Sequence, residues 1–196
     1  TGVQTCALPI SMTASEIEET ENYINKWISE KNKNLIEGIH YSIMFYGGKL
    51  LSHLSIDDKE KKLINLSQIN QNLIIIMDSD ITSSNNKINN TKRRVENEVK
   101  NNGNYCWITE GKEIENYIET SMFKKFVKEI HSDYNNNNFS SDNCITRYKP
   151  KDNGECKYID KVKLAEKITK EWTSVSKNGA LNLECKVNEI TEFIMQ

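Results

Sequence analysis

The chain has 196 residues, of which 37% are hydrophobic and 28% are charged, with a net charge of −2. These values are ordinary for a soluble protein and predict one domain with a core, carrying at most a small appendage. The near-neutral charge gives no general attraction to nucleic acid, so any such contact has to be local or mediated by a metal. No apolar stretch is long enough to cross a bilayer, and we expect no membrane contact.

The first residues need separate treatment. Residues 1–11, TGVQTCALPIS, resemble a sequencing adapter read in frame, and we set them apart from the predicted fold. We therefore expect that the native protein continues upstream. The four cysteines outside this segment include no C-x-x-C pair, so reduced thiols in a cytoplasmic protein are expected rather than a zinc site or a disulfide framework.

Strands alternate with helices along the chain. We predict helices at 20–32, 85–103, 112–130, 160–172 and 183–196, and one or two short helices within 49–67. We also predict strands at 39–48, 72–80 and 104–111, and a surface loop beginning at 131. In the first helix Tyr23, Ile24, Trp27 and Ile28 share one face. The alternation predicts an α/β fold with a parallel sheet covered on both faces. The apolar run Leu73 to Met77 is typical of a strand buried on both sides.

The buried strand at 72–80 ends on two carboxylates, Asp78 and Asp80. Functional crevices in such folds lie at the carboxyl ends of the strands. Two carboxylates about 5 Å apart repel by roughly 3 kcal/mol at an effective dielectric of about 20. A divalent cation with oxygen ligands would offset this repulsion, so the pattern predicts a Mg²⁺ or Mn²⁺ site. The alternative is that both residues cap the following turn or helix.

Three other features of the sequence resemble known functional motifs only in part. The stretch DSDIT also fits the motif that opens the haloacid dehalogenase-like phosphatases, with Asp78 as nucleophile, although the later acidic pair of that family is missing after the third strand. The stretch FYGGK lacks the leading glycine and the Ser/Thr of a P-loop. The three histidines, His40, His53 and His131, show no metal-ligand spacing.

Four segments together resemble a known family. GIHYSIMFYGGKLLSHL, NLIIIMDSD, KINNTKRRV and CWITEGKEIENYI are similar, in order and spacing, to the Toprim domain of the overcoming-lysogenization-defect (OLD) family of ATP-dependent endonucleases. The resemblance implies a Toprim-like small parallel sheet flanked by helices, with C-terminal helices. It divides the chain into the adapter-like residues 1–11, a nuclease core at 12–131, an Asn-rich loop at 132–159 and a C-terminal helical part at 160–196.

The resemblance also implies a function. Family members cleave DNA with a two-metal site that holds Mg²⁺ or Mn²⁺, and they join this domain to an upstream ATPase of the ABC/SMC type. This chain contains no Walker motif, so ATP would bind only in the missing upstream domain. The family further suggests a homodimer. In the segment NTKRRVENEVK, Lys92, Arg93 and Arg94 either contact the DNA backbone or form a solvated helix face.

The resemblance assigns roles to six residues. Asp78 and Asp80 would be metal ligands, followed by Glu115 and Glu113, whose alternative role is to complement the dipole of the helix that they begin. Lys161 would lie near the metals, with Lys163, or a plain surface lysine, as the alternatives. Glu16 occupies the position of the first catalytic glutamate, but the apolar strand expected before it is replaced by adapter-like sequence.

The sequence therefore leaves three functions open. The first is a metal-dependent DNA endonuclease domain, inactive by itself as a fragment. The second is a non-catalytic Toprim-like interaction module, and the third is the phosphatase.

Overall fold

The computed structural model describes residues 4–9, 14–46, 54–55, 64–65, 72–81, 87–135, 147–148, 150–151, 155 and 157–196. Only the backbone is described for residues 4–9, 14–16, 46, 54–55, 64–65 and 147. No helix in this part of the chain is long and apolar enough to cross a membrane.

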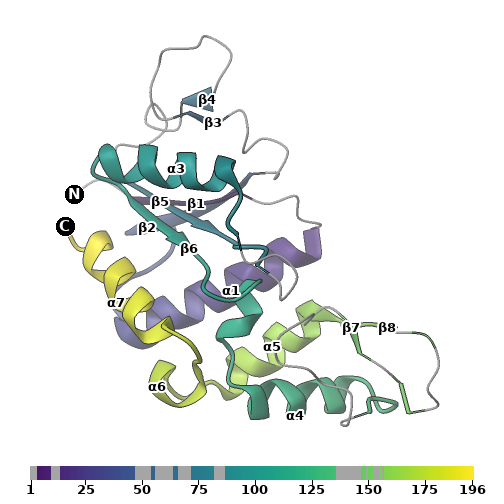
Figure 1. The fold of residues 1–196 in the computed structure, drawn as a ribbon. Helices are drawn as coiled ribbons and strands as arrows, with labels where there is room; N and C mark the ends of the chain where they lie inside the picture. The colour runs from purple at the N-terminus through teal and green to yellow at the C-terminus, as the bar shows by residue number, and fades with distance from the viewer. Residues whose placement is uncertain are drawn as a thin grey trace.

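Four parallel strands form the central sheet in the order β2-β1-β5-β6 (Figure 1). These strands are β1 (Gln4–Pro9), β2 (Tyr41–Tyr46), β5 (Leu73–Met77) and β6 (Tyr105–Ile108). Ile75 of β5 lies opposite Ala7 on one side and Cys106 on the other. The expected α/β fold with a parallel sheet packed against helices is confirmed, and each of the three predicted strands is present.

The first strand differs from the expectation. Residues 1–11 were set apart and the sheet was expected to lack a strand, yet β1 lies between β2 and β5 and pairs with both. The physical reason is that two parallel strands without a neighbour leave backbone N–H and C=O groups unpaired, and an extended apolar segment satisfies them. The expectation of a missing strand is therefore wrong for this chain, whereas the adapter-like origin of residues 1–11 stays a prediction.

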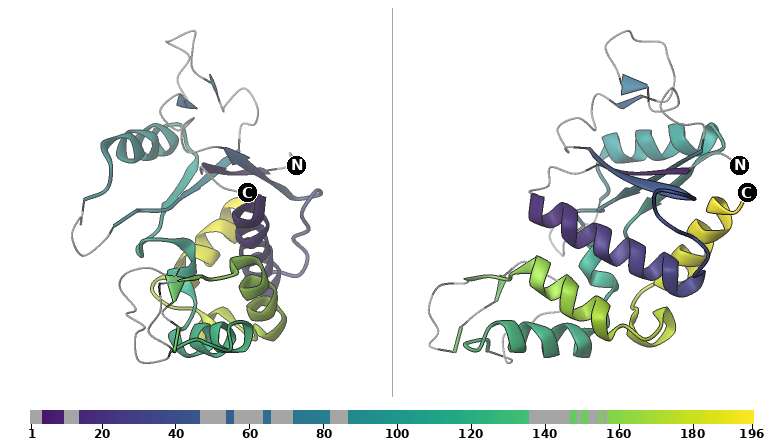
Figure 2. Two further views of the ribbon diagram at one scale, coloured as in Figure 1. Left: turned by 90° about the vertical axis from the view of Figure 1, so that its right-hand side faces the viewer. Right: turned by 180° about the vertical axis from the view of Figure 1, so that it is seen from behind.

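Helices cover both faces of the sheet. Helix α3 (Asn90–Asn101) lies on one face, and α1 (Ala14–Lys31) and α7 (Leu183–Ile194) lie on the other (Figures 1 and 2). Within β5, Ile74 and Ile76 pack into the larger core with α1, and Leu73, Ile75 and Met77 pack into the core under α3. This double burial explains why all five residues of the strand are apolar.

The segment that follows β6 is divided. The single helix predicted at 112–130 consists of the 3₁₀ helix η2 (Ile114–Tyr117) and the α-helix α4 (Thr120–Ile130). The break occurs because Ile118 forms a bridge with Gly179 and the Glu119 carboxylate caps α4 by accepting from the N–H groups of Ser121 and Met122. Helices α5 (Lys161–Glu171) and α6 (Val175–Asn178) complete this layer beyond α1.

Two further expectations need correction. Within the predicted helical segment 49–67, the described residues are the short parallel strands β3 (Leu54–Ser55) and β4 (Ile64–Asn65), and the rest lies outside the described residues. The predicted loop 132–159 contains the antiparallel pair β7 (Arg147–Tyr148) and β8 (Lys157–Tyr158). Short polar segments have weak local preferences, so pairing between strands decides their conformation. The predicted domain boundaries stay predictions.

Candidate functional site

The loops that follow β5 and β6 lie side by side at the carboxyl edge of the sheet and are joined by hydrogen bonds. The Ser79 N–H donates to Thr109 Oγ1 at 2.8 Å, and the Ser79 hydroxyl donates to the Gly111 carbonyl at 2.7 Å. The Asp80 N–H donates to the Lys112 carbonyl at 3.2 Å. Ser79 is itself buried, so these bonds fix the turn that carries Asp78 and Asp80 against the loop that carries Glu113.

The second loop is held close to η2. A Cβ atom at Gly111 would lie 2.4 Å from Cβ of Asn116, so only glycine fits at this approach. The Glu113 N–H donates to Asn116 Oδ1 at 2.9 Å, and the Glu113 side chain accepts from the backbone of Asn116 in a capping box. The hydroxyl of Tyr117 accepts from the Glu110 N–H at 2.8 Å. This bracing places Glu113 and Glu115 at fixed positions beside the β5 turn.

Lys161, the first residue of α5, connects this edge of the sheet to the helical layer. Its ammonium contacts Glu113 Oε2 at 3.4 Å and forms a short ion pair with Glu115 Oε1. The Lys161 side chain is 16% exposed and that of Glu115 only 2%. The N-cap Asp160 accepts from the Lys163 N–H, which sets the start of α5. Lys163 itself forms an exposed ion pair with Asp160, so Lys161 and not Lys163 reaches the carboxylates.

A fourth carboxylate in this cluster, Glu19, was missed by the sequence analysis. Glu19 lies in α1 and is 2% exposed, and its Oε1 atom finds no hydrogen-bond partner among the described residues. Burial and the carboxylate of Glu115, to which it is hydrogen-bonded, raise the pKa of Glu19 well above its ordinary value, against the opposing charge of Lys161. The sequence does contain a sign that Glu19 is buried. Glu19 lies four residues before Tyr23 and eight before Trp27, which puts it on the apolar face of the helix.

The clustered charges shift one another's protonation. Burial, together with the carboxylates of Glu115, Glu113 and Asp80, raises the pKa of Asp78 to about 8. Burial alone would raise the pKa of Glu113, but Lys161 and Lys112 outweigh it and lower that pKa. Burial alone would lower the pKa of Lys161, but Glu115, Glu19 and Glu113 outweigh it and raise that pKa. The cluster therefore holds an ammonium and at least one protonated carboxyl at neutral pH.

Asp80 lies at the rim of the cluster with a different partner. Its side chain is 69% exposed, and its backbone has a φ of +55°, a left-handed conformation that aspartate tolerates better than most residues. The ammonium of Lys92, from α3, forms a short ion pair with the Asp80 carboxylate and donates to the carbonyl of Asp78 at 2.6 Å. Lys92 therefore points toward the turn, whereas a lysine that contacts DNA would point toward solvent.

The alternative that Asp78 and Asp80 cap the next elements is not favoured by these contacts. Helix α3 is capped by Asn89, whose side chain accepts from the Thr91 N–H at 2.8 Å. In the turn after β5 the Ser79 hydroxyl accepts from the Ile81 N–H at 3.1 Å. Glu113 does cap η2, as the alternative for that residue predicts, and it contacts Lys161 as well.

The last predicted residue, Glu16, is in the first turn of α1, and its side chain lies outside the described residues. The structure thus brings together Asp78, Glu113, Glu115 and Lys161, adds Glu19 to them, and places Asp80 at their rim. Thr82, the threonine of the DSDIT motif, also lies outside the described residues.

The donor set fits a magnesium or manganese ion in its chemistry. Its carboxylate oxygens are the ligands that such hard cations prefer, and the orphaned Oε1 of Glu19 lacks the partner that a buried oxygen requires. Within the described ranges, however, no three His, Cys, Asp or Glu side chains are already arranged to hold a metal ion. The ammonium groups of Lys161 and Lys92 lie on the oxygens instead, so a cation would have to replace them.

Comparisons with known proteins add no relative. The sequence matches no protein-family model, and neither the curated proteins nor the solved structures contain a significant match.

Proposed function

We propose that this chain is the metal-dependent DNA endonuclease domain of a Toprim-containing, OLD-like ATP-dependent nuclease. One observation carries the proposal. At the carboxyl edge of a parallel sheet, Glu113 and Glu115 contact one buried lysine, and Asp78 after β5 and Glu19 of α1 lie near enough to interact electrostatically with all three. Folding alone does not favour this arrangement, because each buried carboxylate loses its hydration and repels the others.

The proposed ligands are Asp78, Glu113 and Glu115, with Glu19 as an additional carboxylate and Asp80 at the rim. A bound Mg²⁺ or Mn²⁺ ion, or a pair of them, would activate water and stabilise the charge that develops on a phosphodiester. The protein's own part is to keep the carboxylates in place through the Ser79, Thr109 and Gly111 hydrogen bonds. It also has to release the proton that burial holds on Asp78.

Lys161 would act on the phosphate. Its ammonium is fixed by Glu113 and Glu115 in the metal-free protein, and it would be freed when these carboxylates take a cation. A mobile ammonium next to the reacting phosphate would neutralise charge on the non-bridging oxygens. This role needs a lysine whose charge is permanent, and the raised pKa of Lys161 agrees with it.

The wider assembly follows from the same proposal. DNA would be held through its phosphates, so that sequence preference would be slight. ATP would bind in an upstream ATPase domain of the same protein, and the assembly would be a homodimer. We place its action in the cytoplasm, in defence against phage or in DNA repair.

A second candidate is a non-catalytic interaction module. It is favoured by one observation, the absence of a preformed three-ligand metal cage among the described residues. In this case the lysines would be permanent partners of the carboxylates. The phosphatase is less favoured, because the stretch after the third predicted strand lacks the later acidic pair of that family.

The test is manganese binding and plasmid cleavage by the 196-residue chain. Because β1 supplies the strand whose expected absence predicted an inactive fragment, we expect Mn²⁺ to bind in a calorimetric titration and to support nicking that a chelator stops. Asp78→Asn and Glu115→Gln should each lower the affinity at least about tenfold and abolish nicking, because each removes a charged ligand. Glu129→Gln, an exposed glutamate paired with Lys167, is the matched control and should change neither.

The outcomes separate the candidates. Absence of Mn²⁺ binding by the unaltered chain would exclude the endonuclease proposal and leave the interaction module. Robust nicking by Asp78→Asn would show that the activity comes from elsewhere or from a contaminant.

A further inference from the structure

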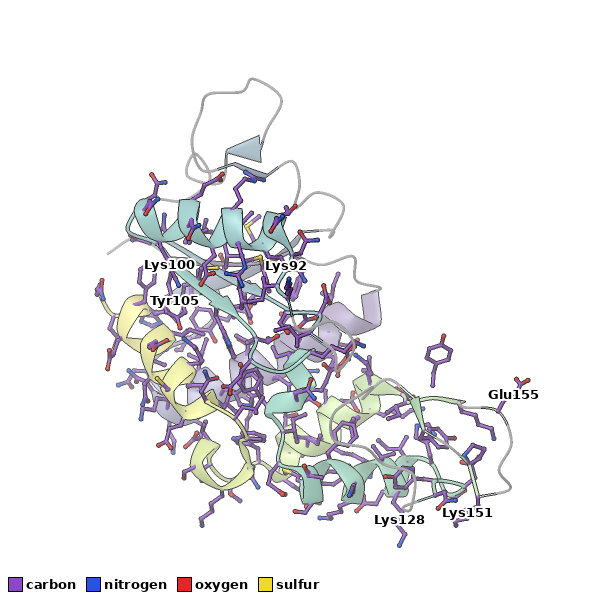
Figure 3. The ribbon with its side chains drawn as sticks, viewed as in Figure 1. Lys92, Lys100, Tyr105, Lys128, Lys151 and Glu155 are labelled. Carbon is purple, nitrogen blue, oxygen red and sulfur yellow. The ribbon has the colours of Figure 1, made fainter. Side chains whose placement is uncertain are left out.

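Lys92 has contacts that a solvated or DNA-binding lysine would not have. It lies in the first turn of α3, and Figure 3 labels it at the opposite end of that helix from Lys100. Its side chain is only 12% exposed, and its ammonium donates both to the carbonyl of Asp78 and to the carboxylate of Asp80. A lysine this enclosed has given up most of its hydration and depends on these two acceptors.

The two partners of this ion pair differ in their freedom to move. Lys92 is enclosed, and the Asp78 carbonyl holds its ammonium at 2.6 Å independently of Asp80. The Asp80 carboxylate is mostly exposed, so it can rotate without disturbing the packing around it. The Asp80 backbone is meanwhile held by its N–H bond to the Lys112 carbonyl. If the pair opens, Asp80 therefore moves and Lys92 stays.

We propose that Lys92 is an internal counter-ion of Asp80 that competes with a divalent cation for this carboxylate. The inference rests on the proposed function, since it assumes that the cluster takes a cation. In the absence of metal the ammonium offsets the repulsion between Asp80 and the neighbouring carboxylates. When a cation binds, either the Asp80 carboxylate has to rotate away from Lys92 and toward the cation, or the cation has to bind close to the positively charged ammonium of Lys92.

Competition between Lys92 and a cation predicts the direction in which the affinity for the cation changes when the lysine is removed. A positive charge fixed next to a cation site weakens binding, so its removal should strengthen binding. A lysine that contacts DNA would instead leave metal affinity unchanged and weaken DNA binding. A lysine that only shapes the turn would weaken metal binding when it is removed, because Asp80 would lose its fixed position.

The experiment is a calorimetric titration of the 196-residue chain with MnCl₂ at low ionic strength. Lys92→Met removes the charge and keeps the length of the side chain, and we expect it to bind Mn²⁺ about tenfold more tightly than the unaltered chain. Lys92→Arg keeps the charge and should stay within about twofold of it. Lys100→Met is the matched control, since Lys100 pairs with Glu96 on the same helix and its loss changes the net charge equally. It too should stay within about twofold.

A double substitution tests the pairing itself. In an Asp80→Asn background, Lys92→Met should change Mn²⁺ affinity by less than about twofold, because the carboxylate for which the two cations compete is gone. Asparagine suits this position, since it also tolerates a positive φ. If the methionine variant melts below the titration temperature, Lys92→Gln replaces it, because it keeps a donor for the Asp78 carbonyl and carries the same expectation.

The failures are distinguishable. Equal or weaker Mn²⁺ binding by Lys92→Met, with binding by the unaltered chain intact, would overturn the role of Lys92 and leave the proposed function standing. Absence of binding by the unaltered chain and by every variant would overturn both.

Discussion

Lysines form ion pairs with glutamates in two regions of this protein, and the physical consequences differ. On the outer helices, Lys167 and Glu129 form an ion pair at 3.1 Å with side chains 44% and 40% exposed. At the edge of the sheet, Lys161 contacts Glu113 and Glu115 with all three side chains largely buried. Water screens the first pair, and its net contribution is about 0–1 kcal/mol. The second group has lost its water, so each charge there depends on the others.

The difference teaches how to recognise a site in this fold. An exposed ion pair places charges where they would be stable anyway, and it indicates nothing about function. A buried group with more carboxylates than lysines is unfavourable for folding, and its members keep protons or share one ammonium to reduce the cost. Such a group is a reason to look for a ligand of opposite charge.

The largest expected effect comes from breaking the buried group. Lys161→Met leaves Glu113 and Glu115 without their shared counter-charge, and we expect the free energy of unfolding to fall by about 3 kcal/mol in the absence of metal. Lys167→Met, the same substitution in the exposed pair, should change it by less than about 0.5 kcal/mol. Urea denaturation of both variants measures the contrast. Equal losses would mean that burial does not distinguish the two regions.

An intermediate effect is expected at Gly111, which lets the β6 loop approach η2. Gly111→Ala would push a methyl group against Asn116 and disturb the capping box that positions Glu113, at a cost of about 2 kcal/mol. Gly103→Ala provides the control. Gly103 has a φ of +73° but open space around it, so only backbone strain of about 1 kcal/mol is expected. Thermal melts in a chelating buffer compare the two, and the reverse order would contradict the close approach at Gly111.

The third expected effect concerns Asp78 and depends on pH. Burial raises the pKa of Asp78 to about 8, whereas an aspartate in the unfolded chain titrates near 4. The folded state therefore binds this proton more tightly, and the associated stability is complete below about pH 4 and is lost as the pH rises toward 8. Asp78→Asn cannot titrate, so in metal-free buffer its stability relative to the unaltered chain should rise steadily as the pH increases from 5 to 8.

Asp133, an exposed aspartate, should show the opposite dependence of stability on pH. Hydrogen bonds from Lys157 and Tyr148 lower the pKa of Asp133, so its contribution is present at neutral pH and is lost as the pH falls. At pH 8, Asp133→Asn should therefore be no more stable than the unaltered chain. Melting curves at pH 5, 6.5 and 8 follow both variants. A pH-independent difference at Asp78 would show that folding does not raise the pKa of its carboxyl.

The sequence alone was sufficient for the local and periodic features. The apolar run Leu73 to Met77 predicted a strand buried on both faces, and Tyr23, Ile24, Trp27 and Ile28 predicted the buried face of α1. Asp78, Glu113, Glu115 and Lys161 were identified as candidates from their positions at the ends of strands and helices and from the family resemblance. The predictions for the strand and for the helix face succeed because burial imposes a period on nearby residues, whereas the roles of the site residues stay predictions.

The contacts between distant residues depend on the tertiary structure. The sequence contains no sign that Gln4–Pro9 lies between β2 and β5, because parallel pairing joins segments that are far apart in the chain. The partners of Lys92 and Lys161 likewise lie 12 to 48 residues away. Glu19 became part of the cluster because α1 packs beside α5, which carries Lys161. Charge interactions depend on distance and burial in space, and spacing along the chain determines neither for residues in different elements.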